Sequence, residues 1–253
     1  MLSEILNVNV FAFLLIFCRT GTVFMLAPGF SSQQVSPMIR LLFAVAVAFM
    51  LTPVLAPKLP AMPGSPWMLG ILILGEIVAG GVLATVARIL IASVQVAGTT
   101  ISFVSAMANA LIYDPIAEQQ SALVSGFLGT LAIVLMFVTD MHHLLIGAMI
   151  DSYTLFVPGQ PPMAGDLAAL ITRHVALTFK VGVQMAAPFL LVAFSYYLGL
   201  GLLTRLVPQL PIFLVGLPLQ IVLSITTFTI VVSSIALAFL SHFQEGLMPF
   251  LTP

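Results

Sequence analysis

Few side chains in this sequence could do chemistry, and the densest group is Asp140, His142 and His143. Carboxylate and imidazole groups are common ligands of zinc and related metal ions. Successive residues of a helix point in different directions, so we expect the two adjacent histidines to face different sides. No Cys or Glu nearby completes a tetrahedral set of ligands. The pattern therefore predicts no metal site, and no cofactor is expected.

A second candidate for catalysis is a series of short motifs. Asp114 and the segments 199–201 and 217–219 follow one another in an order that resembles intramembrane aspartyl proteases. That chemistry needs two carboxylates close enough to share a proton. Leu202 stands where the second aspartate would be required, so the mechanism fails. No nucleophile elbow, P-loop or H-E-x-x-H motif occurs either, and the sequence predicts no enzyme.

The composition indicates a membrane protein. Of 253 residues, 61% are hydrophobic and only 6% are charged. A soluble domain carries roughly 25% charged residues, so this chain could not cover a surface facing water. The net charge is −1 without a basic patch, which argues against nucleic acid as a partner. Cys18 is the single cysteine and excludes an intrachain disulfide.

Apolar runs of about 20 residues predict membrane-spanning helices. The runs are Val10–Leu26, Leu41–Leu55, Trp67–Ile112, Ile116–Val138, Leu167–Leu203 and Pro211–Leu240. The third run is too long for one span, so we expect a break near Gly80-Gly81 or Arg88. No positively charged region precedes the first run, and we expect it to be retained rather than cleaved as a signal peptide. The fold class is therefore all-α, a multi-helix integral membrane protein.

A tight turn is predicted at Tyr113-Asp114-Pro115. Asp114 is a good N-cap and Pro115 a good first helical residue, so the preceding helix should end near Ile112. Small residues recur every four positions on both sides of this turn, and they allow close packing of helices in lipid. They are Gly98, Ser102, Ala106 and Ala110 before it, and Ala122, Gly126 and Thr130 after it. The pattern indicates a helical hairpin, with chance clustering as the alternative.

Three prolines at 208, 211 and 218 predict broken helices, because each removes a backbone donor and crowds the preceding turn. Broken backbone in an apolar region must be buried in protein or line a passage. Charged residues within or beside the apolar runs are also costly. These residues are Arg19, Glu76, Arg88, Lys180 and Arg205. We expect Glu76 and Arg88 to find partners on other helices or subunits, whereas Lys180 and Arg205 could simply extend to an interface.

The segment 201–218, GLLTRLVPQLPIFLVGLP, carries a resemblance to a known family. Its spacing is similar to the signature of FliR and its injectisome counterparts, and the residues concerned are Arg205, Pro208, Gln209, Phe213, Gly216 and Pro218. Further matches are Arg19 with Pro28 and Pro37, the 113–115 turn, and His142-His143-Leu144. The likeness covers about Val10 to Gly246. Pro211 and Leu217 depart from it, since the family commonly has Asn and Phe there.

The resemblance implies a non-enzymatic subunit, present in one copy, of an export gate. Its partners would be FliP and FliQ, with FlhB and FlhA nearby. The gate would move unfolded flagellar proteins across the bacterial inner membrane at the flagellar basal body. Residues 1–165 would form a FliP-like portion and residues 166–253 a FliQ-like helical hairpin. Overall likeness favours a flagellar over a virulence-type system.

The family also places a plugging segment inside the closed pore, and by position this is about 103–120. Bulky residues there could exclude water and so prevent ion leakage. They are Phe103, Met107, Leu111, Ile112 and Tyr113, followed by Asp114 and Pro115. Without the family, ordinary hairpin packing would be the favoured interpretation of this stretch.

A secondary transporter is the alternative function, because broken helices and intramembrane charges also occur in that class. Such folds normally show a pair of interrupted segments in two corresponding halves. The sequence contains no such repeated pair.

Overall fold

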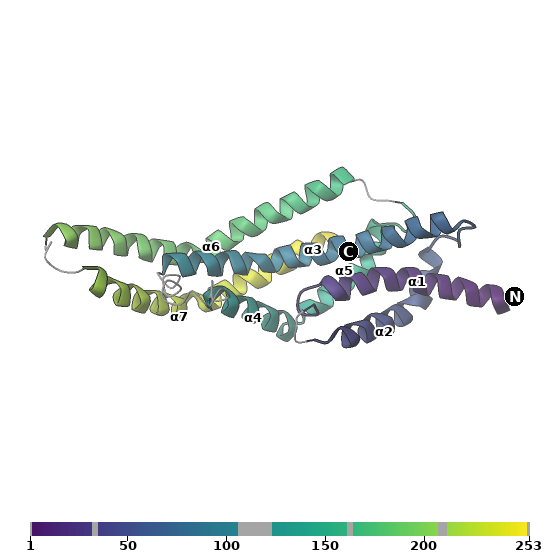
Figure 1. Ribbon diagram of the computed structural model, residues 1–253, viewed down its shortest axis with the longest axis horizontal. Coiled ribbons are helices and arrows are strands. Elements are labelled where there is room, and N and C mark those ends of the chain that lie inside the picture. Colours follow the sequence, from purple (N-terminus) through teal and green to yellow (C-terminus); the bar gives the residue numbers. More distant parts are fainter. Residues whose placement is uncertain (1, 32–34, 106–122, 161–163, 207–211, 252–253) are drawn as a thin grey trace. The chain divides into compact units, whose positions relative to one another are not determined.

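The structure is a computed structural model of the chain, and it describes residues 2–31, 35–105, 123–160, 164–206 and 212–251 (Figure 1). Within these ranges the regular elements are all helices, and the all-α prediction is confirmed. The α-helices are α1 (Leu2–Leu26), α2 (Pro37–Leu55), α3 (Pro66–Val104), α4 (Leu123–Val138), α5 (Met141–Leu155), α6 (Ala164–Leu206) and α7 (Ile212–Leu247). Two short 3-10 helices, η1 (Ala56–Lys58) and η3 (Met248–Phe250), follow α2 and α7.

Among the described residues, four helical stretches are long and apolar enough to cross a membrane. They are Pro37–Lys58, Pro66–Val104, Gly165–Leu206 and Gly216–Phe250. A fifth span results if α4 and α5 are counted together, and α1 contributes the shorter apolar stretch Val10–Leu26. The prediction of a multi-helix membrane protein is therefore confirmed.

The helices pack into two compact units. Unit 1 comprises Met1–Leu90, Thr139–Val175 and Phe243–Pro253, and unit 2 comprises Ile91–Val138 and Ala176–His242. Helices α3, α6 and α7 each contribute one segment to unit 1 and another segment to unit 2. Each unit therefore has a core of its own, and the two are described separately below.

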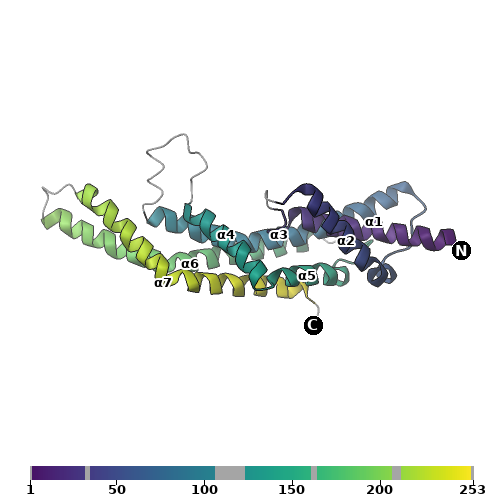
Figure 2. The same cartoon turned by 90° about the horizontal axis from the view of Figure 1, so that it is seen from below.

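Unit 1 is built on the pair formed by α1 and α2, which lie side by side (Figures 1 and 2). Ser36 caps α2, because its hydroxyl accepts from the N–H of Ile39 at 3.4 Å, and Pro37 supplies a favourable first residue. The core of this unit joins α1, α2 and α5. Its buried side chains include Ile16, Ala48, Leu55 and Tyr153.

The predicted break in the third apolar run is wrong. Helix α3 is continuous from Pro66 to Val104, through both Gly80-Gly81 and Arg88. Gly80 lies where α3 contacts α1, since a Cβ atom there would be only 2.6 Å from the carbonyl oxygen of Arg19. Glycine at this position permits close approach of two helices rather than a turn. Similarly, α2 runs through Pro53 and ends at Leu55.

Unit 2 contains a close contact between α3 and α4. A Cβ atom on Gly98 would collide with the backbone of Ser125 and would lie 2.8 Å from its nitrogen. The predicted hairpin contact is therefore confirmed at Gly98. Gly126 has open space around it and Thr130 is exposed, so these two members of the second stripe do not form this contact. Ala106, Ala110 and Ala122 lie outside the described residues.

Helices α6 and α7 also belong in part to unit 2, and they flank the proline-containing region. Helix α6 ends at Leu206 and α7 begins at Ile212, while Pro208 and Pro211 lie outside the described residues. Pro218 lies inside α7 instead of interrupting it. A single proline near the start of a helix removes one donor and can be accommodated with a kink.

The contact at Gly98 gives a direct test of the α3–α4 packing. We expect Gly98→Ala to lower the free energy of unfolding by about 1–3 kcal/mol, because the added methyl group must displace the Ser125 backbone. Thermal unfolding of the purified chain in mild detergent would measure it. Gly126→Ala is the matched control, and it should be neutral or stabilising by up to about 1 kcal/mol. Equal effects of the two substitutions would contradict the observed packing.

Candidate functional site

The most deeply buried charges of the described chain form one ion pair in unit 1. Arg19 of α1 is 1% exposed and Glu76 of α3 is 2% exposed. Arg19 Nε donates to Glu76 Oε2 at 2.7 Å, and Arg19 Nη2 donates to Glu76 Oε1 at 3.1 Å. The guanidinium and the carboxylate therefore meet through two parallel hydrogen bonds, which is the strongest geometry for this pair.

The remaining donors of Arg19 reach α5 and the residue after it. Nη1 donates to the hydroxyl of Ser152 at 3.0 Å, and Nη2 also donates to the carbonyl of Phe156 at 2.9 Å. The ring of Tyr153 lies against the guanidinium, with its centroid 3.8 Å from Cζ. A buried cation thus contacts a carboxylate, a hydroxyl, a carbonyl and an aromatic face. One side chain joins α1, α3 and α5.

The local sequence explains why Glu76 can reach Arg19. Gly80 follows Glu76 by one helical turn and therefore lies on the same face of α3. Because glycine at 80 allows the α3 backbone to approach the carbonyl of Arg19, the carboxylate of Glu76 is carried into hydrogen-bonding distance. The prediction that Glu76 finds a partner on another helix is confirmed.

The other predicted charges behave differently. Arg88, Lys180 and Arg205 are all exposed on the chain itself. Their side chains are therefore available to lipid headgroups, solvent or other proteins, whereas Arg19 and Glu76 are not. The buried ion pair has the chemistry of a packing contact, because both charges are satisfied by groups of the same chain.

Unit 2 contains a second set of polar contacts, which the sequence did not reveal. Gln220 of α7 is 4% exposed, and its amide donates to the carbonyl of Val104 at 2.7 Å and to the hydroxyl of Tyr197 at 3.0 Å. Val104 is the last residue of α3, where backbone carbonyls lack partners within the helix. Gln220 therefore caps the end of α3. The sequence feature that could have indicated this contact is the polar side chain of Gln220 within an apolar stretch, since a buried amide needs hydrogen-bond partners.

Gly216 of the family-like motif has a role in the same region. The hydroxyl of Tyr196 on α6 donates to the carbonyl of Gly216 at 2.6 Å. A Cβ atom on Gly216 would lie 2.8 Å from that hydroxyl oxygen, so a side chain there would displace Tyr196. The glycine and the tyrosine together join α6 to α7.

The remaining predicted site residues divide into two groups. Phe103 lies near the end of α3 and is 74% exposed, and Phe213 and Pro218 lie within α7. The others lie outside the described residues: Met107, Leu111, Ile112, Tyr113, Asp114, Pro115, Pro208 and Gln209. The plug and the proline-region hypotheses therefore remain predictions.

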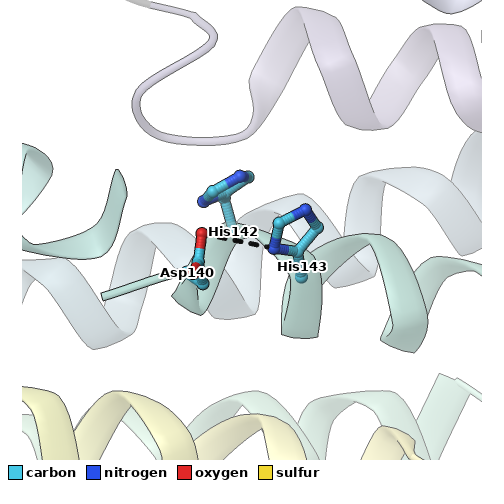
Figure 3. A group of neighbouring side chains, drawn as sticks. All are labelled: Asp140, His142 and His143. Atoms are coloured by element: carbon cyan, nitrogen blue, oxygen red, sulfur yellow. Dashed lines mark ion pairs between the residues drawn. The ribbon is translucent and has the colours of Figure 1, made fainter. Parts of the chain in front are cut away.

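The structure corrects one expectation about Asp140, His142 and His143. The two histidine rings were expected to point apart, but their centroids lie 4.1 Å from each other (Figure 3). Both residues belong to the first turn of α5, directly after Asp140, which has a left-handed backbone with φ of 58°. The long side chains converge there despite the different directions of their Cα–Cβ bonds.

These features define a class of protein, an α-helical membrane protein with several spans, in which the buried polar groups described above join helices. Comparison with known sequences is more specific. The family described as bacterial export proteins, family 1, matches residues 10–246, and the chain belongs to this family. The predicted resemblance to FliR is thereby confirmed.

Individual relatives agree with this assignment. The chain is 33% identical to the flagellar biosynthetic protein FliR of Caulobacter vibrioides over 237 residues, which cover 94% of each chain. It is 34% identical to FliR of Bacillus subtilis over 84% of this chain and 83% of the relative. It is 28% identical to FliR of Escherichia coli over 79% of this chain and 76% of the relative.

The buried ion pair predicts a large asymmetry between single substitutions. We expect Arg19→Met to lower the free energy of unfolding by about 3–5 kcal/mol, because it leaves the carboxylate of Glu76 buried without its cation. Adding Glu76→Met to that variant should restore part of the loss. Thermal unfolding in detergent provides the measurement. Arg88→Met, which removes an exposed arginine from α3, is the control and should have little effect.

The contact of Gln220 with the end of α3 predicts a local effect. Gln220→Leu removes the partner of the Val104 carbonyl and should destabilise the chain by about 1–3 kcal/mol. Amide hydrogen exchange should also become faster in the last turn of α3. Gln184→Leu on α6, where the glutamine is exposed, is the matched control. Unchanged exchange near Val104 would show that Gln220 does not hold this helix end.

Proposed function

We propose that the chain is a non-enzymatic subunit of the flagellar type III protein-export gate. With FliP and FliQ it would form the channel through which unfolded flagellar proteins cross the inner membrane. The observation that carries this proposal is the family match over residues 10–246, together with relatives that are each named flagellar biosynthetic protein FliR. Membership of this family supports a role in the flagellar export apparatus.

The distribution of buried surface fits a subunit of a larger assembly. We compare the most apolar 18-residue stretch of each helix. In α3, 44% of this stretch is buried within the chain, whereas the buried share is 17% in α6 and 11% in α7. Most side chains in these stretches of α6 and α7 are therefore not buried within the chain. Such faces need lipid or other helices around them. FliP and FliQ are the proposed neighbours, with FlhB and FlhA as further partners in the basal body.

The proposed division of the chain follows its sequence. Residues 1–165 would correspond to the FliP-like portion, and residues 166–253 to the FliQ-like hairpin. The division falls at the start of α6, at Ala164. From this point two long apolar helices follow one another, as the hairpin hypothesis requires.

A non-enzymatic role is supported by how the buried polar groups are used. Arg19 contacts both Glu76 and Ser152, and Gln220 and Tyr196 bind backbone carbonyls. These contacts fix the positions of helices, which is the task of a gate subunit. Energy for transport would be supplied elsewhere in the apparatus.

The proposal can be tested by purification from native membranes. A chain carrying a small affinity tag is extracted in gentle detergent, and co-purifying proteins are identified and counted by mass spectrometry. FliP and FliQ should appear in stable excess over this chain. A lone monomer or homodimer under conditions that preserve a known membrane complex would contradict the gate and favour the transporter alternative.

The proposed plug gives a separate prediction. We expect the double substitution Met107→Gly and Leu111→Gly to raise ion leakage through the assembled gate, because smaller side chains no longer exclude water. Conductance of the complex in planar bilayers would measure it. Met248→Gly, which alters an exposed methionine near the end of the described chain, is the control. Unchanged conductance in the double variant would rule out a sealing role for these two residues.

A further inference from the structure

The group formed by Asp140, His142 and His143 is separate from the helix contacts of Arg19, Glu76 and Gln220 described above. Each residue offers one ligand atom, and the three atoms lie within 4.8 Å of one another. Asp140 Oδ1 and His143 Nδ1 are 3.5 Å apart, and the planes of the two histidine rings are tilted by 35° to each other. Figure 3 shows all three side chains projecting from the same side of the first turn of α5.

We propose that these three residues bind a divalent transition-metal ion. Two imidazoles and one carboxylate suit zinc, cobalt and nickel, whereas magnesium and calcium prefer sites built from oxygen alone. Zinc lies about 2.0–2.2 Å from nitrogen and oxygen ligands, so two ligands of a tetrahedral site are about 3.4 Å apart. The observed 3.5 Å between Asp140 and His143 already fits this spacing.

The backbone explains why the carboxylate is available for a ligand. Asp140 precedes α5 at the N-cap position, where an aspartate usually accepts hydrogen bonds from the first turn. Its left-handed backbone instead leaves the side chain without a capping bond. The main-chain carbonyl of Asp140 accepts from the N–H of His143 at 3.0 Å, and the carboxylate faces the ring of His143.

Two of the three ligands are exposed and His142 is half-buried, and the site needs only small adjustments. The side chains of His143 and Asp140 are 68% and 75% exposed, so they are free to rotate. A shift of about 1–2 Å would bring ligand atoms that lie up to 4.8 Å apart to the spacing of a tetrahedral site. Three protein ligands leave at least one coordination position for water. A bound ion would hold Asp140 and the first turn of α5 in one conformation.

A simple ion pair between Asp140 and a protonated His143 would explain their separation equally well. It would not require the ring of His142 beside them, whereas a metal ion uses all three side chains. Dependence of binding on His142 therefore separates the two explanations.

The experiment uses the full chain in detergent, purified with a tag that contains no histidine and stripped of metal with a chelator. Cobalt(II) is added, and its visible absorption reports both binding and coordination geometry. Competition with zinc then gives the affinity. We expect one ion per chain and the spectrum of a four- or five-coordinate site with nitrogen and oxygen ligands.

Three variants locate the ion. Replacing any one ligand, as in Asp140→Asn, His142→Ala or His143→Ala, should weaken binding by at least about tenfold. Asp166→Asn, an exposed carboxylate at the start of α6, is the matched control and should leave binding unchanged. His143→Gln provides a second variant, and circular dichroism without metal checks that each chain is folded.

Failure to bind cobalt or zinc would overturn the proposal. So would binding that survives His142→Ala together with His143→Ala in a folded chain. Neither measurement depends on protein export, so the metal site can fail while the gate assignment stands, and the reverse also holds.

Discussion

The ion pair between Arg19 and Glu76 is the interaction on which the packing of unit 1 depends. A charge buried in apolar surroundings is tolerated only when it is paired and its hydrogen bonds are made. Once Arg19 lies inside α1, the carboxylate of α3 and the polar groups at the end of α5 must be brought to it. Gly80 makes this possible by allowing the backbones of α1 and α3 to approach each other. One side chain thus binds groups on three helices and holds them in register.

In the described part of unit 2, helices are joined by neutral side chains. Gln220 satisfies the last carbonyl of α3, and Tyr196 binds the carbonyl of Gly216, so that α3, α6 and α7 are joined through neutral hydrogen bonds. Close helix approach again depends on glycine, at Gly98 toward α4 and at Gly182 toward Ser93 of α3. Polar groups and glycines therefore determine helix positions in both units, while long apolar faces of α6 and α7 are left for lipid or other subunits.

The sequence predicted the features that depend on composition and spacing along the chain. The all-α class, the membrane class, the family and the partner of Glu76 on another helix followed from apolar runs, isolated charges and the 201–218 motif, whereas α5 lies outside the predicted runs. Features that depend on three-dimensional packing could not be obtained in this way. Gly80-Gly81 was interpreted as a break, because only the position of Arg19 reveals the close approach. Gln220 was not singled out, since its partner Val104 is 116 residues away. The approach of the His142 and His143 rings depends on their side-chain rotamers, which no periodicity indicates.

A structure of the proposed export gate by electron cryomicroscopy would test the central claim most directly. If unit 1 is held together by its own buried ion pair, Arg19 will contact Glu76 of the same chain, with Ser152 and Phe156 at hydrogen-bonding distance, while partner subunits cover α6 and α7. If Arg19 instead pairs with an acidic residue of another subunit, or if Glu76 faces the channel, the ion pair does not fix the three helices. In that case these charges would serve assembly or transport.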